Sequence, residues 1–293
     1  MAFFLQLVVE GIAEGSLYAL VALGFVIIFK ATKVLNFAQG ELVLLGAYLG
    51  VFALIQARLP WWLALPAVLV ACGLIGASIQ WVLMDRLVGK SPLALIMITI
   101  GLANVLQAAV QFLWGAENRA LPAFFPNRPL RWGGVYVQEI YLWALVCSLG
   151  FLAACYLFFH RTRLGVGLQA VANDQIAALS MGIDVRLVFA LAWTVSAVTA
   201  AAAALLLAQI IGVNGNLTFI GLKVFPVVIL GGLESLPGTL VAGLLLGLVE
   251  TLSKGYVGRY FYTDVDAVPF AVMLAILLIR PYGLFGLPRT ERL

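Results

Sequence analysis

Charged residues are scarce in this chain: Asp, Glu, Lys and Arg make up 10% of its 293 residues, while 64% are hydrophobic. A soluble domain carries about a quarter charged residues. A chain this apolar needs lipid as its solvent, and in lipid the backbone must satisfy its own hydrogen bonds, as helices and closed barrels do. The apolar runs are close to the length of a helical span, which favours helices over barrel strands. The composition predicts an all-α polytopic membrane protein.

The sequence also lacks the residue patterns of several chemistries. It contains no G-x-x-x-x-G-K-[ST] phosphate loop, no nucleophile elbow and no spaced pair of metal ligands. We therefore expect no catalytic residue, no metal site and no cofactor in this chain. The net charge of +4 is not gathered into a basic face, which argues against a nucleic-acid partner and fits loops facing an anionic membrane leaflet. The three cysteines lie inside apolar runs and are interpreted as free thiols.

Apolar runs separated by polar breaks predict about seven full spans plus one broken helical hairpin, roughly eight or nine membrane helices in a single domain over residues 1–293. The hairpin is expected at 217–250, where Pro226 and several glycines interrupt the run. It either dips into the membrane or crosses it twice. The first full span ends near residue 29 and the second begins near 36; the later ones are expected at about 61–84, 92–114, 139–159, 187–211 and 266–279.

Positive charge follows the first span rather than preceding it. Lys30 and Lys33 come directly after the first apolar run, and no lysine or arginine precedes it. Because cytoplasmic loops carry the excess of positive charge, this asymmetry places the N-terminus outside and the C-terminus in the cytoplasm. It also argues against a cleaved signal peptide, whose positive charge comes first. The segment 115–138 then lies outside, as a contact for an external binding protein or as a simple lid.

Polar side chains lie within two of the predicted spans. Glu10 and Glu14 share one face of the first span, where the deeper Glu14 either lines a polar path or sits in interface water. In the fourth span, Asn104, Gln107 and Gln111 recur at spacings of three and four and form one stripe. The stripe either lines the path or hydrogen-bonds to another helix, and we favour the second interpretation. We expect no span to carry a fixed charge pair suited to both ends of an amino acid.

A polar break, N-F-A-Q-G, opens the second apolar run at residues 36–40. Asn36 is a good helix cap, and Gly40 and Glu41 follow within one turn. A glycine-containing break beside a membrane helix is costly unless it lines protein or a cavity. Transporters place such broken helices at their substrate sites. The alternative is an ordinary capped helix start at the cytoplasmic face.

The longest polar interruption runs over residues 161–187 and is interpreted as a cytoplasmic loop. Asp174 is expected to cap a short helix over 175–181, and Gly182 to end it in the left-handed conformation. The plainer interpretation is an ordinary basic loop without a docking role. Three small or flexible residues share one face of the short helix and can press into a groove on a partner protein: Ala177, Ala178 and Met181.

Three blocks of the sequence, at 15–41, 161–186 and 221–250, resemble in order the Liv-type permease subunits of the branched-chain (hydrophobic) amino acid ABC transporter family. The first block ends in the N-F-A-Q-G-E motif. The second starts R-x-R-L-G and ends A-x-x-x-G-I, and the third contains V-I-L-G-G-L-E-S-L-P-G. The family usually has histidine where Gln39 stands, so this chain lacks a titratable group at that position.

The resemblance implies an inner-membrane permease subunit of a bacterial ATP-driven importer for branched-chain or hydrophobic amino acids. It implies four kinds of partner: a second related permease, two ATP-binding subunits that hydrolyse the ATP, an external (periplasmic) substrate-binding protein, and membrane lipid. An importer of urea or a short-chain amide from the same family is the alternative substrate class. A stand-alone channel or secondary carrier, and a membrane-embedded enzyme, are alternatives of other classes.

The resemblance and the polar pattern together give two sets of candidate residues. The residues expected to couple the chain to the ATP-binding subunits are Arg161, Arg163, Gly165, Asp174, Ala177, Ala178, Met181 and Gly182. The residues expected along the substrate path are Glu14, Ser16, Tyr18, Asn36, Phe37, Gln39, Gly40, Glu41, Gly231 and Gly232.

Overall fold

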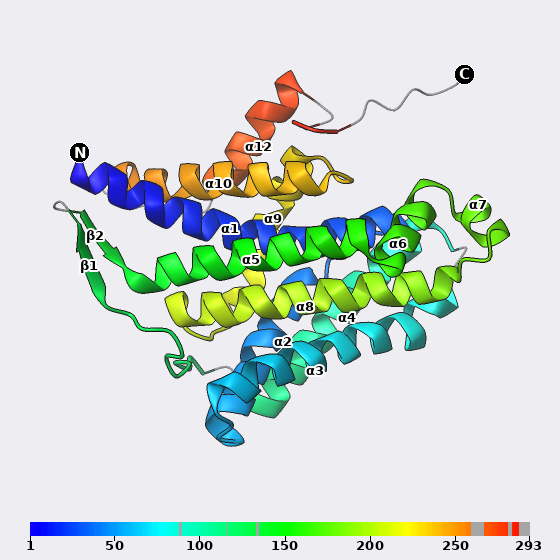
Figure 1. Ribbon diagram of the computed structural model, residues 1–293, viewed down its shortest axis with the longest axis horizontal. Helices are drawn as coiled ribbons and strands as arrows, with labels where there is room; N and C mark the ends of the chain where they lie inside the picture. Colours follow the sequence, from blue (N-terminus) through cyan, green and yellow to red (C-terminus); the bar gives the residue numbers. More distant parts are fainter. Residues whose placement is uncertain (88–89, 116, 133–134, 259–266, 281–282, 287–293) are drawn as a thin grey trace.

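The computed structural model describes residues 1–87, 90–115, 117–132, 135–258, 267–280 and 283–286. Helices dominate these residues, and Figure 1 follows them along the chain. The longer helices are α1 (Ala2–Thr32), α2 (Gln39–Val51), α3 (Trp61–Val82), α4 (Pro92–Trp114), α5 (Glu139–Arg161), α8 (Val185–Ile211), α9 (Leu217–Gly231), α10 (Leu236–Tyr256) and α12 (Val268–Ile279). The shorter elements are the π-helix η1 (Phe52–Gln56), the 3₁₀ helix η2 (Met84–Leu87), α6 (Arg163–Asn173), α7 (Gln175–Ser180), β1 (Pro129–Trp132) and β2 (Val135–Gln138).

Helix α1 is the axis of the bundle. Nearly all of its residues from Gly15 onward are buried, and α10, α8, α5 and α9 all pack against it. The pair formed by α1 and α10 is the most extensive helix contact, because glycines remove side chains from both surfaces. A Cβ atom on Gly15 would lie 2.6 Å from the carbonyl oxygen of Gly243. The two backbones therefore touch directly, as small residues allow in membrane helix pairs.

Seven helices among the described residues are long and apolar enough to cross a membrane: α1, α2 continued by η1, α3 continued by η2, α4, α5, α8 and α10. The chain is therefore a multi-pass membrane protein. The expected span at 92–114 coincides with α4, and the others begin and end close to their predicted bounds. The structure differs from the prediction near the C-terminal end of the chain. There, α10 is long enough to span the membrane, while α9 and α12 are shorter. Residue 266, the predicted start of the last span, lies outside the described residues.

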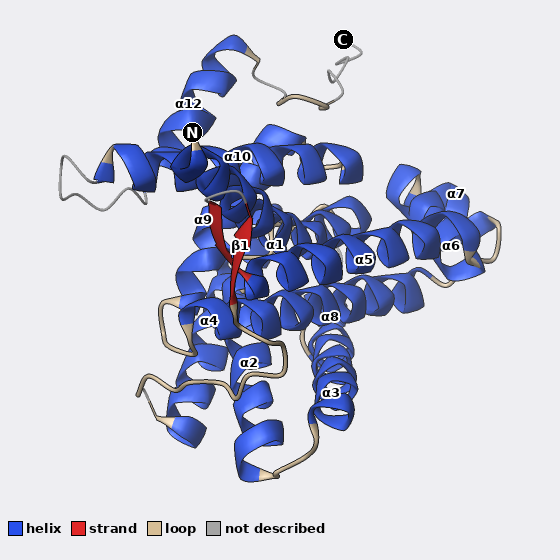
Figure 2. Cartoon of the chain, turned by 60° about the vertical axis from the view of Figure 1, so that its left-hand side comes forward, coloured by secondary structure: helices blue, strands red, loops and turns tan. Residues whose placement is uncertain are grey.

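The segment between α4 and α5 contains a β-hairpin, which corrects the all-α prediction. Strands β1 and β2 pair antiparallel, with Pro129 opposite Gln138. The sequence Val-Tyr-Val of β2 consists of β-branched and aromatic residues that favour strands. A separate bridge joins Arg119 to Val213 and ties the segment to the end of α8. Figure 2 shows the two strands, in red, beside a bundle built from helices.

The two ends of the bundle carry different elements. Figure 1 shows the N-terminus and the β-hairpin at one end of the long axis and α6 and α7 at the opposite end. The turn between α9 and α10 lies beside the end of α1, because Lys33 Nζ is 2.6 Å from a carboxylate oxygen of Glu234. From that turn, α10 runs back along α1 in the opposite direction. The predicted helical hairpin is therefore present, with its tip beside the C-terminal end of α1.

Candidate functional site

Residues 33–38 connect α1 to α2 without forming a helix. Lys33 ends α1 in the left-handed conformation, with a φ of 57°. Three residues later, the side-chain oxygen of Asn36 accepts a hydrogen bond from the backbone N–H of Ala38 at 3.1 Å, which directs the chain into α2. The prediction that Asn36 caps α2 is wrong by two residues. The cap position is Ala38, whose side chain has no oxygen to accept a capping bond.

Helix α2 begins deep inside the bundle. Gln39 Nε2 donates a hydrogen bond to the carbonyl oxygen of Val21 at 3.3 Å. Val21 lies about three turns, roughly 16 Å, before the end of α1 at Thr32. The chain therefore turns back into the bundle after α1 ends. Of the two interpretations of the N-F-A-Q-G motif, the structure supports a helix broken within the bundle over a helix start at the cytoplasmic face.

Gln39 is the centre of a buried polar node that joins α1, α2 and α8. Its Oε1 accepts hydrogen bonds from Asn36 Nδ2 at 3.2 Å and from Ser196 Oγ at 2.8 Å. All three side chains are almost completely buried. Gly24 of α1 makes room for the node, because a Cβ atom there would lie 2.6 Å from Thr199 Oγ1 and 2.7 Å from Gln39 Nε2. The node is therefore closed, and a role for Asn36 and Gln39 along the substrate path stays a prediction.

Beside the polar node, α2 and α9 touch through two glycines. A Cβ atom on Gly221 would lie 2.5 Å from the Cα atom of Gly40, so Gly221 has no room for a side chain. Aromatic rings surround the contact. Phe37 stacks on Phe225 with ring centroids 5.0 Å apart, and Phe25 meets Phe225 edge-on at 4.9 Å. The break, the short helix α9 and these rings thus form one packed unit.

A charge cluster, which the sequence analysis missed, joins α1, α9 and α10. The carboxylate of Glu250 lies 3.0 Å from Lys223 Nζ and 2.8 Å from Lys254 Nζ, and its side chain is fully buried. Lys254 Nζ also lies 3.7 Å from Glu14. These charges pair with one another inside the fold, so the expectation that no span carries a fixed charge pair suited to both ends of an amino acid stays a prediction. Glu250 and Lys254 are four residues apart on a helix, which is a local signal, whereas Lys223 and Glu14 reach them only through the tertiary fold.

Several other predicted path residues have packing positions. Ser16 Oγ lies 2.6 Å from Ser148 Oγ, a hydrogen bond that joins α1 to α5. Gly231 is the last residue of α9, and Gly232 follows at the tip of the hairpin with a φ of 91°. A role for these residues along the substrate path stays a prediction. Two further residues of the predicted path are buried in the core: Tyr18 and Glu41.

The loop over residues 161–187, which we call the coupling loop, contains two helices. Asp174 caps α7 by accepting from the backbone N–H groups of Ile176 and Ala177, and Gly182 follows with a φ of 80°. These features confirm the predicted cap and stop. The preceding helix α6 was not predicted. Its signal is Thr162, whose hydroxyl accepts from the N–H of Gly165 at the helix start.

The exposed apolar surface of the coupling loop differs from the predicted face. Ala178 is buried against the bundle. Gly165 is also buried, and a Cβ atom on it would lie 2.6 Å from the Cα atom of Phe159, so neither residue is available for a partner in this conformation. Arg161, Arg163 and Ala177 are exposed as expected. Three large apolar side chains form an exposed tip, of which the sequence analysis had found only the last: Ile176, Leu179 and Met181.

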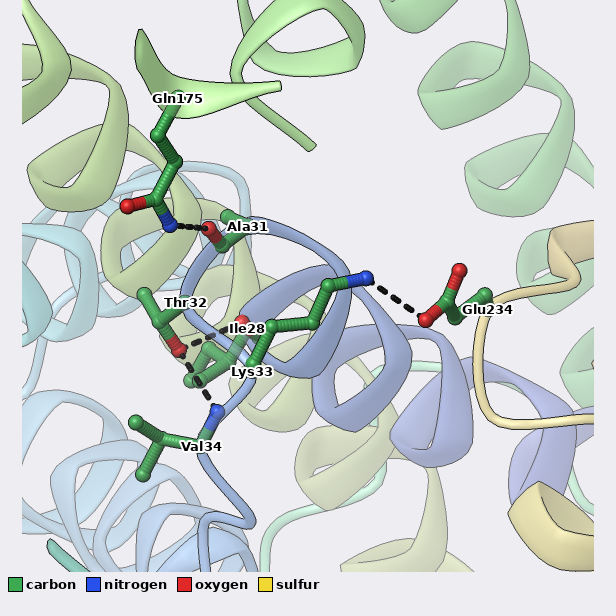
Figure 3. Close-up of polar contacts among 7 residues, drawn as sticks. All are labelled: Ile28, Ala31, Thr32, Lys33, Val34, Gln175 and Glu234. Carbon is green, nitrogen blue, oxygen red and sulfur yellow. Dashed lines mark hydrogen bonds and ion pairs between the residues drawn. The ribbon is translucent and has the colours of Figure 1, made fainter. Parts of the chain in front are cut away.

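The coupling loop, the end of α1 and the hairpin turn meet in one place, drawn in Figure 3. Gln175, the first residue of α7, donates from Nε2 to the carbonyl oxygen of Ala31 at 3.4 Å. That carbonyl belongs to the last turn of α1, where backbone oxygens lack helical partners. Lys33, two residues on, forms its ion pair with Glu234 of the hairpin turn. These contacts link α7 to the end of α1, and the end of α1 to the hairpin turn.

A cavity of about 110 Å³ lies beside this junction. Gln175 of α7, Gln80 of α3 and Trp193 of α8 contribute to its lining. The Oε1 atom of Gln80 is buried without a hydrogen-bond partner among the described residues. A space of this size holds several water molecules. It leaves α7 and the end of α1 room to shift without first breaking a close-packed core.

Comparison with known proteins places this architecture among transport permeases. A family model described as the permease component of a branched-chain amino acid transport system matches residues 7–277. The high-affinity branched-chain amino acid transport system permease protein LivH of Escherichia coli (strain K12) is 32% identical, over 99% of this chain and 98% of its own length. The corresponding permease protein BraD of Pseudomonas aeruginosa is 30% identical over the same shares of the two chains.

A solved structure shows the same fold at low sequence identity. PsaBC from Streptococcus pneumoniae, in complex with Fab, superposes with a TM-score of 0.51 and 14% identity. The alignment covers 95% of this chain and 91% of that one. At this identity the likeness concerns the arrangement of the helices alone.

Proposed function

The chain belongs to the branched-chain amino acid transport permease family, and from this premise we propose that it is the permease subunit of an ATP-driven importer in a bacterial inner membrane. Its substrates are branched-chain or other hydrophobic amino acids, as the names of its relatives suggest. In this role the N-terminus and the β-hairpin lie outside, and the coupling loop and the C-terminus lie in the cytoplasm. The Lys and Arg residues, most of which then fall inside, support this orientation.

The proposed transporter contains four other protein subunits. The chain has no phosphate-loop motif of its own, so two ATP-binding subunits supply the hydrolysis. A second related permease completes the membrane part, and an external binding protein delivers the substrate. The chain itself holds no cofactor in this proposal.

The exposed apolar side chains at the tip of α7 are the main structural support for the proposal. Ile176, Leu179 and Met181 expose 78%, 57% and 83% of their surface at the end of the bundle opposite the β-hairpin. Such a cluster of large apolar side chains on a short capped helix suits a groove on another protein. Arg161 and Arg163 lie exposed on the same loop and add positive charge at the rim of the contact.

The contacts at the junction suggest how ATP drives the substrate path. Closure of the ATP-binding subunits pushes on α7, and Gln175 passes the displacement to Ala31 at the end of α1. The ion pair between Lys33 and Glu234 couples the same displacement to the hairpin of α9 and α10. The break at 33–38 and the polar node around Gln39 then open and close the path in alternation. Broken helices with freed backbone groups serve this purpose in other transporters.

A docking experiment tests the proposal. The substitution Met181→Asp places a carboxylate in the apolar contact, and Met181→Leu is the matched control that keeps its size and apolar character. Burying the charge without a partner is costly, so we expect Met181→Asp to lose the co-purifying ATP-binding subunits and to reduce leucine uptake at least ~30-fold, the equivalent of about 2 kcal/mol. Met181→Leu should retain both. Unchanged uptake and co-purification in Met181→Asp would show that α7 is not the docking element.

A further inference from the structure

The cavity beside the junction of α7 and α1 is lined by most of the elements that meet there. Its lining residues come from the end of α1, the chain that leads into α2, α3 with η2, the start of α4, α7 and α8. Figure 3 shows three of them, Thr32, Val34 and Gln175. Trp193 and Gln80 expose only 1% and 2% of their surface, whereas Gln175 is exposed. The cavity therefore lies between the core of the bundle and α7.

The lining of this cavity is mostly apolar and carries no charge among the described residues. An ion that entered would lose its hydration without gaining a charged partner, which is strongly unfavourable. The lining therefore rejects ions, zwitterionic amino acids included, and favours an uncharged guest. Its aliphatic and aromatic carbon comes from one valine and five larger residues, which are Met84, Leu87, Leu95, Phe189 and Trp193.

One polar group on the lining has no partner. The Oε1 atom of Gln80 is buried and accepts no hydrogen bond within the described ranges, which destabilises the fold unless a donor reaches it. The terminal torsion of a glutamine side chain is soft, so the carboxamide can turn its oxygen toward a donor in the cavity. The other two polar lining side chains already have partners. Thr32 Oγ1 donates to the carbonyl oxygen of Ile28, and Gln175 Nε2 donates to that of Ala31.

Water alone satisfies this cavity poorly. A buried water molecule typically makes two to four hydrogen bonds to polar groups, and Gln80 has the one unpartnered buried side-chain oxygen on the described lining. Water held loosely against carbon is displaced by an apolar group with a gain in affinity. A guest with an apolar body and a single N–H or O–H donor satisfies both parts of the lining.

The size of the cavity limits the size of such a guest. Its volume is about 110 Å³. An engineered cavity of about 150 Å³ in another protein binds benzene, so this one suits a molecule of roughly five to seven non-hydrogen atoms. A short branched alcohol has this size, one donor and an apolar body.

We propose that this cavity is a binding site for a small uncharged amphipathic molecule, such as a short branched alcohol, and that its occupation inhibits transport. The donor of the guest bonds to Gln80, and its apolar body packs against Trp193 and Met84. The guest fills the space into which α7 and the end of α1 can shift, so ATP hydrolysis is less well coupled to transport. Binding itself is independent of the proposed function, whereas the effect on coupling rests on it.

Photolabelling of the full chain in native membranes tests the site. The probe is 3-azibutanol, a four-carbon alcohol whose diazirine reacts with neighbouring atoms on irradiation. Mass spectrometry maps the labelled residues with and without excess isobutanol, which separates saturable labelling of a cavity from partition into lipid. The variant Gln80→Leu keeps the size of the side chain and removes the acceptor. The matched control is Ser78→Ala, because Ser78 is exposed on the same helix and bonds to the carbonyl oxygen of Leu74.

The expected result is labelling of Gln80, Met84 or Trp193 that isobutanol displaces and leucine does not. Gln80→Leu should weaken the labelling of the remaining positions about fivefold, through the loss of one hydrogen bond, and Ser78→Ala should leave it unchanged. Labelling of lipid-facing residues only, equal labelling in Gln80→Leu, or displacement by leucine would overturn the site. Leu95→Phe, which fills the cavity and keeps the acceptor, is a second test and should abolish the labelling.

Transport in proteoliposomes tests the inhibition. Isobutanol should lower the leucine imported per ATP hydrolysed several-fold in the unsubstituted transporter but not in Gln80→Leu. Leu95→Phe should be poorly coupled without any alcohol, because its larger side chain occupies the same space. Coupling that is insensitive to isobutanol in a transporter labelled at the cavity would overturn the inhibitory role. Absence of ATP-binding subunits from the unsubstituted protein would instead remove the proposed function, and the labelling result would still decide the binding site.

Discussion

Two groups of carboxamide side chains in this membrane protein, at the start of α2 and on α4, differ in their hydrogen-bond partners. At the start of α2, Gln39 and Asn36 are buried and hydrogen-bonded to each other, with Ser196 and the backbone of α1 completing the node. On α4, Gln107 and Gln111 lie at the surface and make no hydrogen bond within the ranges that the structure describes. In lipid both groups require partners. Folding satisfies the first group, whereas Gln107 and Gln111 find no partner within the described part of this chain.

Filling the space next to the buried node should have the largest effect on the folded subunit. In Gly24→Val, the new side chain would overlap Thr199 Oγ1 and Gln39 Nε2, which lie 2.6 and 2.7 Å from the position of its Cβ. Overpacking together with lost hydrogen bonds destabilises by about 4 kcal/mol. The melting temperature in detergent should fall sharply or the protein should fail to accumulate. The control is Gly101→Val on α4, where no atom lies within 4 Å, and it should melt like the unsubstituted protein.

Removing the buried charge at the centre of the second polar cluster should have the next largest effect. Glu250→Gln leaves Lys223 and Lys254 without their shared carboxylate, and breaking such a buried pair destabilises by about 3 kcal/mol. Glu10→Gln is the control, since Glu10 accepts its hydrogen bond from the nearby Gln6. Thermal unfolding in detergent separates the two variants. Equal melting temperatures for both would show that the cluster does not hold α9 and α10 to each other.

Replacing glutamine by leucine in each of the two regions should affect the stability of the subunit differently. Gln39→Leu removes the acceptor of Asn36 and Ser196, which leaves buried donors unpaired and destabilises the subunit by about 2 kcal/mol. Gln111→Leu removes an exposed group and should leave the melting temperature of the isolated subunit unchanged. A loss of subunit stability in Gln111→Leu as large as in Gln39→Leu would erase the distinction between the two regions.

The smallest effect concerns the link between the coupling loop and α1. Gln175→Ala removes a single hydrogen bond to Ala31 and should change stability by about 0.5–1 kcal/mol. We expect transport per ATP hydrolysed to fall several-fold while the ATP-binding subunits remain attached. Ser180→Ala on the same helix is the control, because Ser180 bonds only to the carbonyl oxygen of Ile176 in α7. An unchanged coupling ratio in Gln175→Ala would mean that the displacement takes another route.

The sequence predicts the parts of this fold that depend on local patterns. Apolar runs gave α4 at its observed bounds, and Asp174 and Gly182 gave the start and stop of α7. These signals are local because length in a membrane, helix capping and left-handed backbone each depend on a few neighbouring residues. The resemblance of three ordered blocks identified the family, which the match over residues 7–277 confirms.

The geometry of the site could not be predicted in the same way. Gln39 donates a hydrogen bond to the carbonyl oxygen of Val21 because the chain turns back into the bundle after α1. No local sequence pattern predicts how far the chain returns. Glu14 and Lys223 join the charge cluster from distant parts of the chain. The rotation of a short helix is also set by its surroundings, which is why Ala178 of the predicted docking face proves to be buried. Such contacts depend on tertiary packing, which cannot be predicted from sequence periodicity.

The most direct test of this account is the subunit composition of the protein purified from its native membrane in mild detergent. Quantitative mass spectrometry should find a second permease subunit and two ATP-binding subunits for each copy of this chain, or two copies of the chain with two ATP-binding subunits. That composition is the predicted result. A stable, folded chain recovered without any ATP-binding subunit, from membranes that show leucine uptake before extraction, would contradict the account. It would indicate a channel or secondary carrier.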